Sequence, residues 1–237
     1  MKNYFITGTD TEIGKTFATC GLIHAITARG IKVAPMKPIA AGTINLDGTD
    51  INEDVAVLMS AAGNNFAISD VNPYCFREGI APHIAARHEG RPIDIEVIRA
   101  AYKRLCTISD MVLVEGAGGY SVPMSDTESM ADIPKWLELD VILVVGMRIG
   151  CINHATLTAD AVRARGLKLA GWIANTPAAQ MAAYEENLAT LKKVIAAPLL
   201  GTIPRVPASY LISALDATKL AAKHLDVAPL VDRKSVV

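Results

Sequence analysis

The chain has 237 residues, enough for one large domain or two small ones. Hydrophobic residues make up 51% and charged residues 20%, which excludes a disordered, collagen-like or coiled-coil chain. The net charge of -1 gives no strong basic field, so we expect no nucleic-acid or membrane partner. Because no apolar run reaches the roughly 20 residues of a membrane helix and the N-terminus does not resemble a signal peptide, we expect a cytoplasmic protein.

The first part of the chain alternates between strand-like and helix-like segments. An apolar run at Tyr4–Thr7 precedes a helical pattern over Lys15–Arg29. A second run, Ile31–Lys37, leads into a polar, glycine-containing loop over residues 41–49. A helix is expected to follow over Asp50–Ala62.

The middle of the chain is harder to interpret at first and then becomes regular. Residues 64–92 are rich in Asn, Pro and Gly, and only a short helix at Pro82–His88 is predicted there. A helical pattern covers Ile93–Ile108. Met111–Gly116 and Val141–Gly146 are continuous apolar runs, which are typical of strands buried on both faces of a parallel sheet.

The last third repeats the same alternation. Leu169–Asn175 and Leu199–Pro204 are predicted to be strands. Helices are predicted over Asn153–Arg165, Gln180–Ile195 and Ala208–His224.

This order of elements predicts one three-layer α/β domain over residues 1–224, with a mostly parallel central sheet flanked by helices. Residues 225–237 are expected to form a C-terminal tail. In such sheets ligands bind beyond the carboxyl ends of the strands. Residues that directly follow strands are therefore the candidates for a site.

A phosphate-binding loop is predicted after the first strand, in the sequence GTDTEIGKT from Gly8 to Thr16. Backbone N–H groups and a helix N-terminus would face a polyphosphate, Lys15 would reach its β- and γ-phosphates, and Thr16 could ligate Mg²⁺. Five residues rather than the usual four separate Gly8 from Gly14, so the spacing is irregular. The alternative is a tight turn with an exposed lysine, but the position between a strand and a helix favours a P-loop NTPase.

Three further residues could complete a phosphoryl-transfer site. Lys37 ends the second strand and could stabilise a second anion, although it could also be a solvated lysine before a proline. Glu115 ends an apolar strand before a glycine-rich turn, where P-loop proteins place an acid near Mg²⁺; it could also be only a strand-end acid. Asp54 is a weaker second carboxylate, because Asp in a first helical turn commonly compensates the helix dipole.

Strand and helix ends in the second half supply weaker candidates. Asn175 ends a strand and could recognise an adenine edge, and the loop after Pro204 could cover the base, although both are ordinary turn residues when taken alone. Asn153 is a plausible helix cap, and the start of its helix could bind a substrate carboxylate. The four cysteines and five histidines show no metal-ligand spacing, so no transition-metal site is expected.

Eight ordered blocks between about residues 3 and 206 resemble the dethiobiotin synthetase family. They are GTDTEIGKT, MKPIAAG around Lys37, VNPY at 71–74, APHIAA at 81–86, VEGAGG at 114–119, GCINHA at 150–155, AGWIAN at 170–175 and APLLGTIP at 197–204.

The resemblance implies an ATP-dependent ligase of biotin synthesis. Such an enzyme closes a ureido ring on 7,8-diaminopelargonate with CO₂, requires Mg²⁺ with ATP as co-substrate, and releases ADP and phosphate. The resemblance also implies a homodimer with its sites near the interface.

The family's functional residues map onto matching positions of this sequence. The resemblance implies that Lys37 and Lys15 are catalytic and that Thr16, Asp54 and Glu115 hold Mg²⁺. It places ATP against Glu12, Ile13, Gly14, Lys15, Thr16, Phe17, Asp54, Glu115, Gly116, Ala117, Gly118, Asn175, Thr176, Pro204, Arg205 and Val206. It places the substrate against Thr11, Lys37 and Ala41, and against Cys151, Ile152 and Asn153 of the partner subunit.

Three positions depart from the family pattern. Ala41 stands where many members have Ser, Arg148 where Lys is common, and Thr176 where Asp is common. The last change puts the base selectivity in question.

Three other classes compete with this interpretation. A P-loop switch ATPase of the partitioning type would carry an extra lysine early in the loop, where this chain has Asp10. An amide-forming synthetase of the cobyric acid type would need a glutaminase domain, for which 237 residues leave no room. A small-molecule kinase would form a phosphorylated product.

Overall fold

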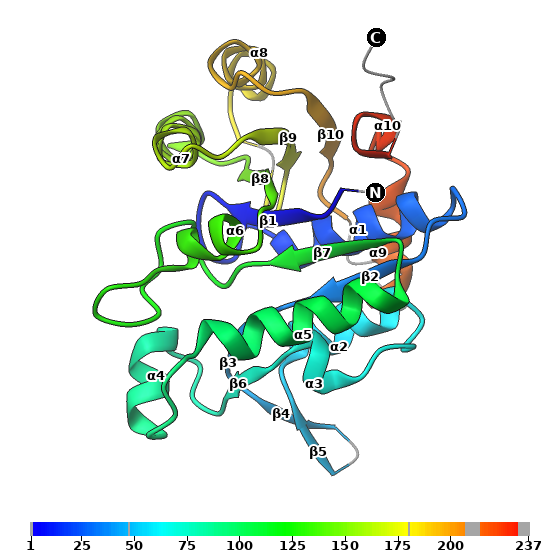
Figure 1. Cartoon of the computed structure of the whole chain (residues 1–237). Helices are drawn as coiled ribbons and strands as arrows, with labels where there is room; N and C mark the ends of the chain where they lie inside the picture. Colours follow the sequence, from blue (N-terminus) through cyan, green and yellow to red (C-terminus); the bar gives the residue numbers. More distant parts are fainter. Residues whose placement is uncertain (1, 47, 180, 207–213, 232–237) are drawn as a thin grey trace, which may run out of the picture.

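The computed structural model describes residues 2–46, 48–179, 181–206 and 214–231. Within these residues, six parallel strands form one sheet in the order β10-β9-β8-β1-β7-β2 (Figure 1). The strands are β1 (Tyr4–Gly8), β2 (Val33–Met36), β7 (Met111–Glu115), β8 (Asp140–Gly146), β9 (Leu169–Asn175) and β10 (Leu199–Ile203). The predicted α/β fold with a parallel central sheet is confirmed.

The sheet separates two hydrophobic cores, because successive side chains of a strand point to opposite faces. In β7, Met111 and Leu113 belong to one core, and Val112 and Val114 to the other. The first core contains residues of α1 (Lys15–Thr27), α9 (Ala214–Ala222) and α10 (Ala228–Val231). The second contains residues of α5 (Ile95–Ile108), α7 (Cys151–Ala164) and α8 (Tyr184–Val194). The continuous apolar runs in the sequence are thus strands covered on both sides.

Short elements extend beyond the β2 edge of the sheet. The strands β3 (Ile39–Ala41) and β6 (Tyr74–Phe76) pair in parallel. The helices there are α2 (Glu53–Ala61), α3 (Ile68–Val71) and α4 (Pro82–His88), and the helix predicted at 82–88 is confirmed. After β7 come η1 (Met130–Asp132) and α6 (Ile133–Trp136).

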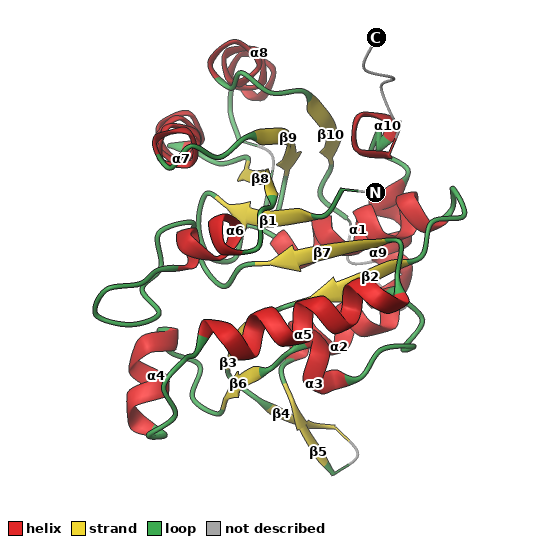
Figure 2. Ribbon diagram, viewed as in Figure 1, coloured by secondary structure: helices red, strands yellow, loops and turns green. Residues whose placement is uncertain are grey.

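The loop expected over residues 41–49 is instead largely a hairpin. The strands β4 (Ile44–Leu46) and β5 (Thr49–Ile51) pair antiparallel and project away from the central sheet (Figure 2). Asn45 Nδ2 donates to Asp50 Oδ1 at 2.9 Å across the hairpin, so Asp50 belongs to a strand. The following helix begins only at Glu53, where the Asn52 side chain accepts from the Val55 amide at 3.4 Å.

The C-terminal segment is more firmly packed than a tail. Val227 and Leu230 are buried in the same core as α1, and the Tyr4 hydroxyl donates to the Leu230 carbonyl at 2.8 Å. Residues 225–231 therefore belong to the folded domain. The rest of the expected tail, residues 232–237, lies outside the described residues, as do residues 208–213 of the expected last helix.

The strand order brings the candidate residues together at the carboxyl ends of the strands. The central strand β1 lies between β7 and β8, and β2 lies next to β7. Because all these strands are parallel, the loops that follow Gly8, Met36, Glu115 and Gly146 emerge at the same end of the sheet. In the described part of the chain, no helix has the length and apolarity needed to cross a membrane.

Candidate active site

The phosphate loop connects β1 to α1, and contacts with the neighbouring strands β8 and β9 hold it in place. Gly14 has a φ of 80°, a left-handed conformation that favours glycine. A Cβ at Gly14 would lie 2.3 Å from Asn175 Nδ2, which donates to the Ile13 carbonyl at 2.6 Å. Ile13 is completely buried against Gly146, where an added Cβ would lie 2.5 Å from its Cγ2. The irregular loop is therefore held by a buried side chain and by a hydrogen bond from β9.

The loop lysine points back along its own loop. Lys15 Nζ donates to the Asp10 carbonyl at 3.1 Å, and the side chain of Asp10 accepts from the Thr11 amide at 2.8 Å. Asp10 also forms an ion pair with Arg148, which follows β8. Burial lowers the pKa of Lys15, although the Glu115 carboxylate opposes this shift.

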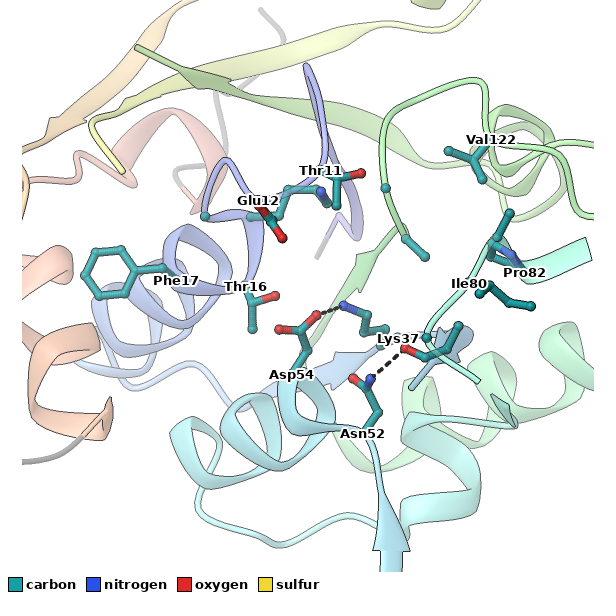
Figure 3. Close-up of a pocket in the computed structure, with 17 residues that line it drawn as sticks. Thr11, Glu12, Thr16, Phe17, Lys37, Asn52, Asp54, Ile80, Pro82 and Val122 are labelled. Carbon is teal, nitrogen blue, oxygen red and sulfur yellow. Dashed lines mark hydrogen bonds and ion pairs between the residues drawn. The ribbon is translucent and has the colours of Figure 1, made fainter. Parts of the chain in front are cut away.

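Two carboxylates, a lysine and a hydroxyl meet beneath the loop. Lys37 Nζ forms an ion pair with Asp54 and lies 3.0 Å from Glu115 Oε1. Thr16 Oγ1 donates to the same Glu115 atom at 2.7 Å. Figure 3 shows Lys37, Asp54 and Thr16 converging from three different segments of the chain. Lys37 is only 5% exposed and Glu115 is fully buried.

The charges in this cluster stabilise one another. Burial would lower the pKa of Lys37, but the Glu115 and Asp54 carboxylates outweigh it and raise the pKa. Burial would raise the pKa of Asp54, but the Lys37 ammonium outweighs it and lowers the pKa. The lysine is therefore held as a cation and Asp54 as an anion.

The same residues fit a magnesium ion. Thr16, Asp54 and Glu115 offer only oxygen donors, which Mg²⁺ prefers. Glu115 Oε2 is buried and has no hydrogen-bond partner, so one carboxylate oxygen remains for a cation. Among the described residues, no group of three or more His, Cys, Asp or Glu side chains gathers as a transition-metal site would require.

A cavity of about 780 Å³ opens above this cluster. It is lined by eleven of the expected contact residues, namely Thr11, Glu12, Gly14, Lys15, Thr16, Phe17, Lys37, Ala41, Asp54, Ala117 and Gly118. Gly116 lies deeper: its amide donates to the Ile6 carbonyl at 3.0 Å, and an added Cβ would lie 2.9 Å from Phe5. Ile13 and Glu115 are fully buried and do not line the cavity either, so most but not all of the predicted contacts of the first half of the chain share one space.

The expected base contacts gather around a second cavity of about 430 Å³. Its lining residues are Thr176, Tyr184, Thr202, Pro204, Arg205 and His224. Val206 lines a smaller adjoining cavity with Pro204 and Arg205. Asn175 is 3% exposed, and its amide supports the phosphate loop through the Ile13 carbonyl.

The expected carboxylate-binding segment lies at the start of α7. Cys151 is buried and its amide donates to the Arg148 carbonyl at 2.9 Å, whereas Ile152 is half-buried and Asn153 is exposed. None of the three lines the 780 Å³ cavity formed by the described residues of this chain.

Several residues of the site were missed by sequence reasoning. Asn52, Ile80, Pro82 and Val122 also line the large cavity. Asn72 donates from Nδ2 to the carbonyls of Lys37 at 2.6 Å and Tyr74 at 3.0 Å, which fixes the backbone of the lysine. In the sequence this residue is a turn signal before Pro73, and nothing there reveals its partners.

Comparisons with known sequences give a consistent result. A family model described as an AAA domain matches residues 2–210. A protein of Aromatoleum aromaticum named ATP-dependent dethiobiotin synthetase BioD is 50% identical over 203 residues, which cover 86% of this chain and 90% of that protein. A protein of the same name from Ralstonia nicotianae is 47% identical over 97% of both chains.

Solved structures with a similar fold are more distant in sequence. The cell division ATPase MinD of Pyrococcus furiosus has a TM-score of 0.53 and 16% identity, over 93% of this chain and 97% of that one. A ParA family ATPase of Chlorobium tepidum has a TM-score of 0.51 and 15% identity, over 97% and 94% of the two chains. At such identities the likeness shows the P-loop NTPase fold alone.

Proposed function

The chain belongs to the ATP-dependent dethiobiotin synthetase family, and from this premise we propose that the large cavity is where ATP drives closure of a ureido ring on 7,8-diaminopelargonate. The enzyme is an ATP-dependent ligase of biotin synthesis. The phosphate loop binds the triphosphate, and the Lys37 side of the cavity binds the diamine and CO₂. Thr11, Lys37 and Ala41 line that cavity next to the loop, which supports this arrangement.

The proposed reaction has three steps. One amine adds to CO₂, loses a proton and becomes a carbamate anion. A carbamate oxygen attacks the γ-phosphorus, and ADP leaves, so that a carbamic–phosphoric anhydride is formed. The second amine attacks the carbamate carbon, and inorganic phosphate leaves as the ring closes. No protein nucleophile is needed, so the protein contributes positioning and electrostatic stabilisation.

The residues of the cavity suit this charge distribution. Each step concentrates negative charge between the carbamate and the triphosphate, where Lys15 and Lys37 supply positive charge. We propose that Thr16, Asp54 and Glu115 hold Mg²⁺, which when bound neutralises phosphate oxygens. Glu12 also lines the cavity, and in Figure 3 its carboxylate points into it, so it can face a protonated amine.

The base end of the nucleotide is assigned to the second cavity. Thr176, Pro204 and Arg205 line this space, and Val206 lines the adjoining one. Asn175 stands between the two ends and holds the loop through the Ile13 carbonyl. We propose that the base lies against these residues while the triphosphate extends toward Lys15.

A homodimer is part of the proposal. Ile149 is 88% exposed and Leu157 is 61% exposed, and both flank Asn153 at the start of α7. Exposed apolar side chains mark an interface where they form a contiguous patch, and we propose that these two belong to one. In a dimer, this segment would bring backbone N–H groups and Asn153 to the substrate carboxylate of the other subunit.

The observation that carries the proposal is that Lys37, which contacts the buried Glu115, lines one cavity together with residues of the phosphate loop. The test measures ATP hydrolysis by the purified protein with diaminopelargonate, with and without bicarbonate. We expect hydrolysis to depend on both and the product to be dethiobiotin. Hydrolysis that ignores either compound, or a phosphorylated product, would contradict the proposal.

The partitioning-type switch ATPase is the main alternative. Its structures share the fold, but the loop position of its extra lysine is Asp10 here, which pairs with Arg148. Hydrolysis stimulated by a protein partner but not by diaminopelargonate would favour that class.

A further inference from the structure

In this structure a lysine stands where a metal ion is expected. Lys37 Nζ contacts both Asp54 and Glu115, and Thr16 donates to the Glu115 oxygen that Lys37 also contacts. These three partners of the cluster are the residues proposed to hold Mg²⁺. The Lys37 ammonium group and the metal ion would therefore compete for the same two carboxylates. The proposed reaction also requires Lys37 beside the substrate carbamate.

We propose that Lys37 is an exchangeable stand-in cation: it neutralises Asp54 and Glu115 while no metal is bound, and it turns to the substrate carbamate only when Mg²⁺ takes over these carboxylates. The inference rests on the proposed function, because the metal site and the carbamate come from it. It adds an order of events to that function.

The first argument is the burial of Glu115. This carboxylate is fully buried, and its Oε2 atom has no hydrogen-bond partner. A buried carboxylate without a neighbouring cation is strongly unfavourable. A charged Glu115 therefore needs a neighbouring cation, and Lys37 is the one in contact with it in this structure.

The second argument is the contrast with Lys15. Its ammonium donates to the Asp10 carbonyl, and the structure gives it no ion pair with either carboxylate. Lys15 is therefore positioned to bind phosphate groups, whereas Lys37 is positioned to neutralise the carboxylates of Asp54 and Glu115. The two lysines of the cavity have different partners and different tasks.

The third argument concerns how Lys37 can move. Its backbone is fixed on both sides, because its amide donates to the Val71 carbonyl at 2.8 Å and its carbonyl accepts from Asn72 at 2.6 Å. The exchange must therefore occur by side-chain rotation. The lysine stem is flexible and ends in a compact charge, and Lys37 already lines the large cavity into which it would turn.

The exchange gives the reaction an order. While Lys37 is held by Asp54 and Glu115, the carbamate lacks one of its cationic partners. Arrival of the metal with the nucleotide releases the ammonium group. The carbamate is then stabilised only where a triphosphate is ready to react with it.

The test uses Mn²⁺ as the probe, with free Mn²⁺ measured by electron paramagnetic resonance in the nucleotide-free protein. We expect Lys37→Met to bind Mn²⁺ at least about tenfold more tightly than the wild type, because a competing charge within ion-pair distance is removed. Lys37→Arg keeps the charge and should bind Mn²⁺ as weakly as the wild type. Lys103→Met removes an exposed lysine on α5 and should also change nothing.

A second measurement does not depend on the folding of Lys37→Met. The wild type is labelled with ¹³C at lysine Cε, and the Lys37 signal is assigned by its absence in Lys37→Arg. We expect this signal to shift when Mg²⁺ and a non-hydrolysable ATP analogue are added, but not when the analogue is added with EDTA.

Equal Mn²⁺ affinity of wild type and Lys37→Met would overturn the proposal, as would a Lys37 signal that the metal does not move. Either result would leave the proposed function intact if bicarbonate-dependent ring closure is observed. If the wild type shows no bicarbonate-dependent ring closure, the proposed function itself is contradicted.

Discussion

The two ends of the proposed nucleotide site are built differently. At the phosphate end, Lys37 and Glu115 are almost completely buried, and the Lys37 ammonium group contacts both Glu115 and Asp54. At the base end, Arg205 is exposed and the cavity is lined by hydroxyl, aromatic and cationic side chains from three segments. One end is a closed network of charges, and the other is an open surface.

This difference follows from what each end must do. Stabilisation of a transferring phosphoryl group requires charges that are in position and shielded from water when the reaction begins. A base needs only a surface of suitable shape, and the phosphates supply most of the binding energy. We therefore expect substitutions at the phosphate end to be far more damaging than those at the base end.

The largest effect is expected for Lys37→Ala. Loss of one electrostatic stabiliser of the transition state lowers turnover by about 10²–10³-fold. Phosphate release with diaminopelargonate and bicarbonate measures this, and circular dichroism at saturating Mg²⁺ checks the fold. Lys103→Ala, on an exposed face of α5, is the control. Near-wild-type turnover of Lys37→Ala would remove Lys37 from the catalytic assignment.

A smaller effect is expected for Glu115→Gln, which keeps the shape of the side chain but removes its charge. The Mg²⁺ concentration for half-maximal activity should rise by roughly tenfold or more, because a carboxylate ligand is lost. Mg²⁺ titration of the activity measures this, and Glu186→Gln on the exposed surface of α8 should leave the curve unchanged. An unchanged curve for Glu115→Gln would show that Glu115 is not a Mg²⁺ ligand and only ends the strand.

Asn72→Ala tests how firmly the phosphate end is held. The buried Asn72 amide bridges the carbonyls of Lys37 and Tyr74, so its loss leaves buried acceptors without partners. We expect the free energy of unfolding to fall by about 1–3 kcal/mol, measured with urea. Asn187→Ala also removes an Nδ2 bond to a carbonyl, but that bond is exposed to solvent, so its loss should cost less. Equal losses would show that Asn72 has no special role.

The smallest effect is expected for Thr176→Asp at the base end. A carboxylate would add a charged acceptor for an exocyclic amino group, worth about 1.5–3 kcal/mol against about 0.5–1.5 kcal/mol for a neutral one. The wild type should therefore accept CTP or GTP to some extent, and the variant should favour ATP several-fold more. kcat/KM for the three nucleotides measures this, with Thr176→Asn as the uncharged control. Strict and unchanged ATP selectivity would exclude Thr176 from base recognition.

The central sheet could be predicted because its strands are buried on both faces. The strand expected at Leu169–Asn175 is found with the same bounds. The region beyond β2 could not be predicted as well, because its strands are three residues long and β3 pairs with β6 from a distant part of the chain. Two helices were expected there: the one at Pro82–His88 is present with the same bounds, and the one expected over Asp50–Ala62 begins only at Glu53.

For the site, the sequence indicated which residues follow strands but not how they meet. Lys15, Lys37 and Glu115 could be chosen because parallel strands end at one edge. That Lys37 lies between Asp54 and Glu115 depends on the direction of side chains, and Asp54 carried only a weak signal in the sequence. Asn52 and Asn72 resemble ordinary cap and turn residues, and their carbonyl partners become visible only in the fold.

The buried Ile13 also limits how this loop can be reused in protein engineering. Transfer of the segment from Gly8 to Thr16 onto another sheet would carry an apolar side chain that needs a place in the core. In this chain that place exists because Gly146 has no side chain, and the loop is held because Asn175 donates to its backbone. A graft would have to bring a glycine and an asparagine from two other strands as well. The unit that can be transplanted is therefore the junction of three strands.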